Sequence, residues 1–116
     1  MTKFFKLLAI FAITTPFPIS AEAKETYIPI LVPITGFLSL EGTAQRNGAI
    51  QALDEARNNL KIKYEVSDTS TSPEVAVTAL QRALSRGKPV AIAAPIFGTQ
   101  MLAMLPIAKR AGVPLI

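Results

Sequence analysis

Apolar and polar positions along this chain alternate between short apolar runs and longer stretches with helical spacing. The first run, Tyr27–Val32, has β-branched residues and no polar alternation, which is typical of a strand buried on both faces. Pro29 cannot donate to a neighbouring strand, but proline is tolerated near a strand start. A helix is predicted next, from about Glu41 or Thr43 to about Asn58. Its apolar positions recur at helical spacing, at Ala49, Ala52, Leu53 and Ala56.

A second strand and helix follow. Ile62–Val66 predicts a short strand, and the polar segment Ser67–Ser72 predicts a loop. Ser72 suits the N-cap of the next helix, and Pro73 suits its first position, where the missing N–H would be unpaired anyway. We expect the helix to end at Arg86, just before a glycine. Its buried stripe is predicted at Ala76, Val77, Leu80, Ala83 and Leu84.

The third unit has the same order. Val90–Ala94 predicts a strand, Pro95–Gly98 a loop, and about Thr99–Ala111 a helix that stops at the following glycine. Pro106 would remove a backbone hydrogen bond inside that helix, and would therefore kink it or delay its start. Val113–Ile116 predicts the opening of a fourth strand.

This order predicts an α/β fold, a doubly wound parallel sheet with right-handed crossovers and helices on both faces. The predicted loops Pro33–Gly42, Ser67–Ser72 and Pro95–Gly98 follow strands, so they share one rim, where open α/β sheets bind ligands. The chain ends on Leu115 and Ile116, apolar residues suited to a sheet interior. We therefore expect an incomplete lobe, either the N-terminal part of a larger protein or the product of a degraded gene.

Three glycines near the first loop do not form a nucleotide motif. Gly36, Gly42 and Gly48 are spaced six apart, which matches neither a dinucleotide-binding fingerprint nor a P-loop. We interpret Gly48 as a point of close helix packing on the sheet, and Gly36 and Gly42 as turn residues. A helix N-terminus on the rim can still hold an anionic group such as a carboxylate.

Residues 1–23 have the features of an export signal. Lys3 and Lys6 form a positive segment, Leu7–Ile13 is an apolar run, and Ala21-Glu22-Ala23 fits a cleavage site. The apolar run is too short to cross a bilayer, which needs about 20 residues. We predict cleavage after Ala23, a ligand-binding lobe over residues 24–116, and a periplasmic location.

Composition argues for binding rather than catalysis. Cysteine and histidine are both absent, which excludes disulfides, thiolate or histidine metal sites, cysteine nucleophiles and Ser-His-Asp triads. The net charge of +4 is scattered, without a Lys/Arg stripe or interleaved aromatic residues, so nucleic-acid binding is not expected. We predict no enzyme activity, no metal and no cofactor. A flavodoxin-like enzyme acting through Asp68 or Glu41 stays open as an alternative without a sequence signature.

Three segments resemble a known family. Ile30–Ala56 carries a strand, a Pro-Ile-Thr-Gly loop and an Asn-Gly-Ala-Ile-Gln-Ala-Leu helix; Asp68–Val77 carries an acidic turn and the sequence Ser-Pro-Glu-Val-Ala-Val. Ala91–Ile116 contains Ala-Pro-Ile-Phe-Gly-Thr and later Ala-Gly-Val-Pro-Leu-Ile. Together they resemble the start of a type 1 periplasmic binding protein, closest to the leucine/isoleucine/valine-binding-like proteins of ABC importers.

The resemblance implies a two-lobed protein that closes on a small polar ligand, typically an amino acid, and delivers it to an inner-membrane ABC permease. It implies ligand contacts from the loop after the first strand, Thr35–Glu41, and from the loop after the third strand, Phe97–Gln100. The chain departs from the family pattern at two of these positions. Glu41 replaces an aromatic residue that packs on the ligand, and Gly98 replaces a serine contact. The candidate ligand-binding residues are Thr35, Gly36, Phe37, Leu40, Glu41, Phe97, Gly98 and Thr99.

Several of these residues have a purely structural alternative. Phe37, Leu38 and Leu40 suit a pocket lining or loop packing equally well. Glu41 suits the first turn of a helix, where the helix dipole favours an acid, and Thr99 suits an N-cap. Asp68, outside the candidate set, suits a turn in which it bonds its own backbone.

The function also has alternatives. A ligand-binding sensor or envelope-regulatory domain would use the same lobe, because a fold does not fix a function. A non-functional gene fragment is the third possibility.

Overall fold

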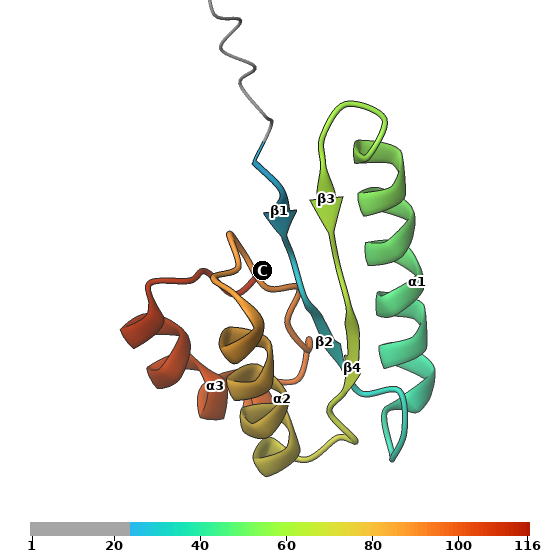
Figure 1. The fold of residues 1–116 in the computed structure, drawn as a ribbon. Coiled ribbons are helices and arrows are strands. Elements are labelled where there is room, and N and C mark those ends of the chain that lie inside the picture. Colours follow the sequence, from blue (N-terminus) through green and yellow to red (C-terminus); the bar gives the residue numbers. More distant parts are fainter. Residues whose placement is uncertain (1–23) are drawn as a thin grey trace, which may run out of the picture.

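A parallel sheet lies between two helical layers (Figure 1). The computed structural model describes residues 24–116, so the export signal predicted for residues 1–23 lies outside the described residues. Helix α1, Ser39–Ala56, covers one face of the sheet, and α2, Pro73–Arg86, with α3, Gly98–Ala111, covers the other (Figure 1). The strands are β1 Thr26–Tyr27, β2 Ile30–Val32, β3 Ile62–Lys63 and β4 Val66–Asp68.

The strands are parallel, as the crossovers predict. β1 pairs with β3 and β2 with β4, and single parallel bridges extend the sheet from Ile30 to Ala93 and from Ile92 to Leu115. The line of β3 and β4 is therefore at one edge of the described sheet, and the line of β1 and β2 is inside it. The doubly wound α/β prediction is confirmed, with the strand order reversing beside β2, where such folds bind ligands.

The predicted strands are interrupted or shifted. Pro29 separates β1 from β2, yet the ladder continues, because Ile28 N–H donates to the Lys63 carbonyl at 2.9 Å and Ile30 N–H to the Glu65 carbonyl at 2.8 Å. The predicted loop Ser67–Ser72 is wrong at its start: its first two residues pair in register with β2. Polar side chains predicted a loop here, but strand pairing uses backbone hydrogen bonds, which polar residues form as well as apolar ones.

The main hydrophobic core lies between the sheet and the pair α2 and α3. Leu31 and Ile92 of the sheet meet Leu80 of α2 and Met104 of α3, all fully buried. The stripe predicted on α2 is confirmed at Ala76, Leu80 and Ala83, while Val77 and Leu84 are half-buried. Burial of this apolar surface is the principal force that holds this layer together.

Helix α1 contacts the sheet differently, and two predictions about its glycines are wrong. Gly48 is exposed, and a Cβ added there would meet nothing within 4 Å, so it is not a packing glycine. Gly42 is not a turn residue but lies inside the helix, buried so close to the Pro33 carbonyl that a Cβ would overlap it. The close approach predicted for Gly48 is therefore made by Gly42, six residues or about 1.7 turns earlier in the helix.

The N-cap predicted for α2 is confirmed, and the N-cap predicted for α3 is wrong. Ser72 caps α2, since its Oγ accepts a hydrogen bond from Val75 N–H at 3.3 Å. Thr99 does not cap α3: the N-cap is Phe97, and Thr99 is in the first turn. Pro106 neither delays nor interrupts α3, which runs from Gly98 to Ala111, and its exposed position leaves the carbonyl it cannot bond open to water.

Candidate functional site

The candidate site is the rim where β2, β4 and the strand segment at 92–93 end. Residues 33–38, 69–72 and 95–97 connect these strands to α1, α2 and α3, and the N-termini of all three helices lie at this end of the molecule (Figure 1). The prediction that the three loops share a rim is confirmed by the contacts between them.

Asp68 ties the first two loops together. Its Oδ1 accepts from Ile34 N–H at 2.8 Å, from Thr35 N–H at 3.1 Å and from Ser70 N–H at 2.8 Å. Its Oδ2 accepts from the hydroxyls of Thr35 and Ser70. The bond to Ser70 N–H confirms the turn predicted for Asp68. The bonds to residues 34 and 35 add a long-range role, because they fix the loop after β2.

These donors also fix the charge of Asp68. Partial burial favours the neutral acid, but the hydrogen bonds from the Thr35 hydroxyl and from the backbone N–H groups of Ser70, Thr35 and Ile34 outweigh it. Together they lower the pKa of Asp68 from 3.8 to about 2. Asp68 is therefore an ionised acceptor at neutral pH that organises the rim, and it is unsuited to accept a proton there.

The turn after Asp68 has an uncommon backbone. Ser70 and Thr71 both have positive φ, 47° and 55°, which is rare outside glycine and rarest for a β-branched residue. Gly36, with φ of 88°, lies against this turn: a Cβ there would be 2.8 Å from Thr71 Oγ1 and 2.9 Å from the Ser70 carbonyl oxygen. The turn role predicted for Gly36 is confirmed. The two loops fit each other closely because residue 36 has no side chain.

Two glutamines, which the sequence reading missed, hold the rest of the rim. Gln45 of α1 donates to the Ala94 carbonyl at 2.5 Å and accepts from Ile96 N–H at 3.4 Å, so it fixes the third loop. Gln100 of α3 is fully buried and donates to the carbonyls of Thr69, 3.1 Å away, and Ser72, 3.2 Å away. A signal existed for Gln100: it shares a helical stripe with Met104 and Ala108, and a buried polar side chain needs partners.

The predicted site residues fall into two groups. Thr35 and Gly36 are part of the loop network just described, although both are exposed. The others extend from the rim without side-chain hydrogen bonds among the described residues. Phe37 is 91% exposed, Leu40 80% and Phe97 36%, and Glu41, Gly98 and Thr99 are also exposed.

The structural alternatives for these residues are resolved in part. Leu38 is buried and packs in the loop, whereas its neighbours Phe37 and Leu40 are free of such packing. Glu41 is in the first turn of α1, in agreement with the helix-dipole interpretation. Within residues 24–116 no cluster of acidic side chains could hold a metal ion. None of the helices between Lys24 and Ile116 has the length and apolar character that a membrane crossing requires.

The chain is similar to proteins of known kind. Residues 25–116 match a family model described as periplasmic binding protein. The branched-chain amino acid transporter substrate binding protein LivJ from Streptococcus pneumoniae, solved in complex with isoleucine, is 26% identical with a TM-score of 0.74. The leucine binding protein LivK from Thermotoga maritima is 27% identical with a TM-score of 0.71. No curated protein matches the chain.

A third structure shows the fold alone. It is a solute binding protein of an ABC transporter from Rhodopseudomonas palustris in complex with 3,4-dihydroxy benzoic acid, 24% identical with a TM-score of 0.68, covering 78% of this chain and 26% of its own. The matches to LivJ and LivK cover 79% and 78% of this chain, and 28% and 26% of theirs. The chain thus spans little more than a quarter of the length of these proteins.

Proposed function

Because this chain belongs to the periplasmic binding protein family, with type 1 leucine/isoleucine/valine-binding proteins among its structural neighbours, we propose that its rim binds a small polar solute, an amino acid or a similar carboxylate, for an ABC importer. The family consists of solute-binding proteins rather than enzymes. The partner of the loaded protein is then an inner-membrane ABC permease, and the place of action is the periplasm, reached through cleavage of the signal after Ala23.

One observation carries this proposal. The loops at the carboxyl ends of the parallel strands are fixed by Asp68, Gln45 and Gln100. At the same rim, the Phe37 ring is exposed, and the Thr99 hydroxyl in the first turn of α3 has no hydrogen-bond partner among the described residues. Rigid loops with unengaged side chains are what a solute site requires, because little ordering is left to be done on binding.

The roles follow from residue chemistry. Phe37, Leu40 and Phe97 supply apolar surface to the hydrocarbon part of the solute. The Thr99 hydroxyl and the free N–H groups of the first turn of α3, which begins at Gly98, suit its carboxylate. Glu41 suits an ammonium group, and Thr35 and Gly36 set the position of the first loop. An opposing surface is needed to enclose the solute, so weak affinity is expected of these residues alone.

The test is a thermal-shift screen of the chain with single amino acids and with aromatic acids such as 3,4-dihydroxy benzoic acid. A ligand that binds only the folded state raises the melting temperature, and the rise grows with the logarithm of the ligand concentration once that concentration exceeds Kd. Thr99→Val removes the hydroxyl and keeps the branched shape, so it should abolish the shift without lowering the melting temperature of the free chain. Leu102→Ala, an exposed change on α3 away from the loops, is the control.

The outcome that contradicts the proposal is a melting temperature that no solute in the panel moves at millimolar concentration. The export step is tested separately, by sequencing the N-terminus of the protein recovered from the periplasm. A chain that begins at Lys24 supports it, and a chain retained in the cytoplasm with Met1 intact contradicts it.

A further inference from the structure

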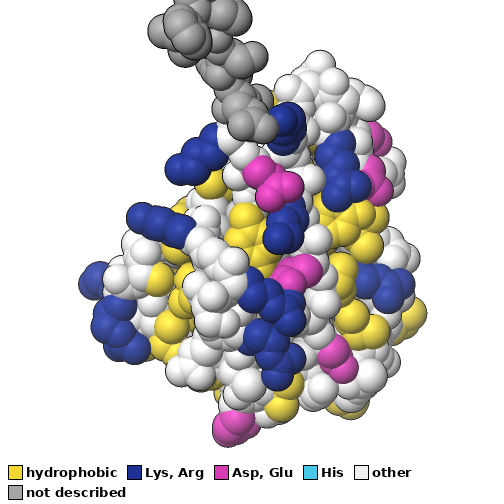
Figure 2. Space-filling model, in the orientation of Figure 1, with side chains coloured by type: hydrophobic (Ala, Val, Ile, Leu, Met, Phe, Trp, Pro, Cys, Tyr) yellow, Lys and Arg dark blue, Asp and Glu magenta, His cyan; other side chains and the backbone are white. Residues whose placement is uncertain are grey.

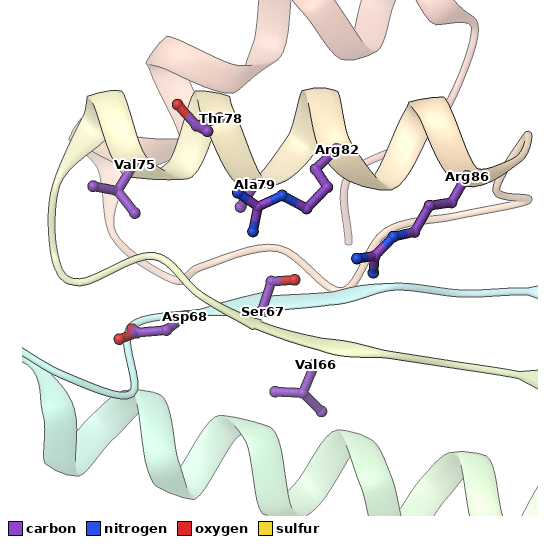
Figure 3. A pocket seen from close by; sticks show the side chains of 8 residues that line it. All are labelled: Val66, Ser67, Asp68, Val75, Thr78, Ala79, Arg82 and Arg86. Atoms are coloured by element: carbon purple, nitrogen blue, oxygen red, sulfur yellow. The ribbon is translucent and has the colours of Figure 1, made fainter.

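A groove lies beside β4, on the side of the sheet that α2 covers (Figure 3). Its volume is about 360 Å³, and its strand side is Val66–Asp68. Arg82 and Arg86 of α2 extend over it towards the strand (Figure 3). The remaining lining residues, all on α2, are Val75, Thr78 and Ala79. We call this feature the edge groove; it shares only Asp68 with the network of the rim.

The backbone of β4 is available along this groove. Ile30 N–H donates to the Glu65 carbonyl and Thr69 N–H to the Val32 carbonyl, so the Glu65 carbonyl and the Thr69 N–H point towards β2, and Ser67 between them pairs with it. Alternate residues of a parallel strand bond the same neighbour. The N–H and C=O groups of Val66 and Asp68 therefore face away from β2. Within residues 24–116, β4 has no second strand to receive them.

The charges around the edge groove are basic and partly unpaired. Arg86 forms an ion pair with Glu65, which also accepts a hydrogen bond from the Tyr27 hydroxyl. Arg82 has no hydrogen-bond or ion-pair partner for its guanidinium among residues 24–116. Figure 2 shows Lys and Arg side chains gathered on this face, over α2 and the strands beside it. Asp68 forms no ion pair with Arg82; its carboxylate oxygens accept hydrogen bonds from the rim loops instead.

We propose that the edge groove is a docking site for an extended, acidic segment of a partner polypeptide, which adds to β4 as a further strand. Its backbone would pair with the outward groups of Val66 and Asp68, as in other cases of strand addition to a free sheet edge. Every second side chain of the segment would point to the α2 side. Acidic residues at these positions would meet Arg82, and the residues between them would point to the opposite face of the sheet.

A second copy of this chain fits the edge less well. Pairing of β4 with β4 across a two-fold axis would bring the two Arg82 guanidinium groups into the same region, and like charges across an interface are unfavourable. Further along the same edge, Lys61 and Lys63 are exposed, and charged side chains of this kind oppose pairing between identical edges. An acidic segment benefits from every one of these cations.

The experiment uses a short fluorescent peptide that alternates valine and glutamate, and measures its binding to the full chain by anisotropy. Two N-methylated forms of the peptide are the central test. One carries methyl groups on the valine nitrogens and the other on the glutamate nitrogens, so they block opposite edges of the added strand. Loss of one or two backbone hydrogen bonds should weaken binding of one form by about tenfold and leave the other form unchanged.

The role of the Arg82 charge is tested by substitutions in the protein. Arg82→Glu should weaken binding of the glutamate peptide roughly fivefold or more, and should create binding of a peptide that alternates valine and lysine. Arg110→Glu, an exposed arginine at the end of α3, is the matched control and should change neither. In hydrogen exchange followed by NMR, the bound peptide should slow the amides of Val66 and Asp68, while the amide of Ser67, already bonded to β2, should change little.

Three results overturn the proposal. Equal binding of the two N-methylated forms would mean that the peptide is held by charge without strand pairing. A lack of binding by the glutamate peptide would remove the docking site altogether. Concentration-dependent dimers in sedimentation, with slowed exchange at Val66 in the absence of peptide, would assign the edge to a second copy. None of these results depends on whether the rim binds a solute.

Discussion

The two faces of the sheet are covered in different ways. On one face, α2 and α3 bury Leu80, Met104 and Ala108 completely against Leu31 and Ile92. On the other face, the only buried residue of α1 is a glycine, Gly42. The first layer is held by apolar side chains that interlock, and the second by a close backbone approach.

Polar contacts complete the attachment of α1. Gln45 bonds the loop after the third strand segment, and at the other end Arg57 Nε donates to the Ile62 carbonyl at 3.2 Å. The apolar positions that predicted this helix, such as Leu53 and Ala56, are only half-buried. Local stability within one domain can therefore differ between layers, and the layer with the weaker core carries the loop that we propose to contact the solute.

The largest effect is expected from breaking the apolar layer. Leu80→Ala removes a fully buried side chain from the centre of the core and leaves a cavity between α2, α3 and the sheet. Changes of this kind cost about 2–5 kcal/mol. The measurement is urea unfolding followed by circular dichroism. Leu102→Ala is the matched control, since Leu102 on α3 is 70% exposed, and it should change the free energy of unfolding by less than about 0.5 kcal/mol.

The second test concerns the backbone approach of α1. Gly42→Ala places a methyl group on the Pro33 carbonyl, which cannot rotate away, so α1 must move off the sheet. We expect a loss of about 2–3 kcal/mol, at the upper end of overpacking effects. Gly48→Ala in the same helix meets no atom within 4 Å, and should gain about 0.5–1 kcal/mol because alanine favours helix. Equal effects of the two substitutions would show that α1 is not held by this contact.

A comparison of α2 with the Gly42 contact shows which features of the fold the sequence predicts. The α2 helix was predictable almost to the residue, because its cap Ser72, the proline after it and the final glycine are local signals, and its apolar stripe is strongly periodic. The close approach at Gly42 was not, since it depends on where the Pro33 carbonyl lies after folding. Glycine spacing along a helix identifies neither which glycine faces the sheet nor how near it comes.

In the candidate site, too, the location of the loops was predictable from the sequence, and the side chains that join them were not. That the loops would meet on one rim followed from parallel strands alone. Which side chains would join them did not, because Gln45 and Gln100 bond to carbonyls far away in the sequence, and neither carries a motif. Asp68 was recognised as a turn residue from its neighbours, but its bonds to Ile34 and Thr35 depend on the register of β4 against β2.

The third prediction tests the junction at Asp68, which links β2 and β4 between the two layers. Its pKa is lower in the folded chain than in the unfolded chain, so the unfolded state binds more protons at acid pH. The resulting stability is complete above about pH 4 and is lost as the pH falls towards 2. Asp68→Asn should lower the free energy of unfolding at pH 7 by about 1–2 kcal/mol, because the amide replaces an ionised acceptor of several hydrogen bonds.

The diagnostic feature of this prediction is the pH profile. The wild-type chain should lose stability between pH 4 and 2 more steeply than Asp68→Asn, in urea unfolding curves recorded across that range. Asp54→Asn is the control: Asp54 is an exposed acid of α1 that accepts from the Tyr64 hydroxyl, and its replacement should leave the steep acid loss in place. Parallel profiles for the wild-type chain and Asp68→Asn would contradict the organising role of Asp68.

The smallest expected effect comes from the N-terminal caps of the helices, which differ between the two layers. The Ser72 hydroxyl of α2 accepts from Val75 N–H and donates to the Glu74 carboxylate, 2.6 Å away, which lowers the pKa of Glu74. Ser72→Ala should therefore cost about 1 kcal/mol and should raise the pKa of Glu74 in an NMR titration. Helix α1 begins without any side-chain cap, so Ser39→Ala at its first residue should cost almost nothing. If both substitutions cost the same, the capping bond does not stabilise α2, and the difference between the layers rests on the core alone.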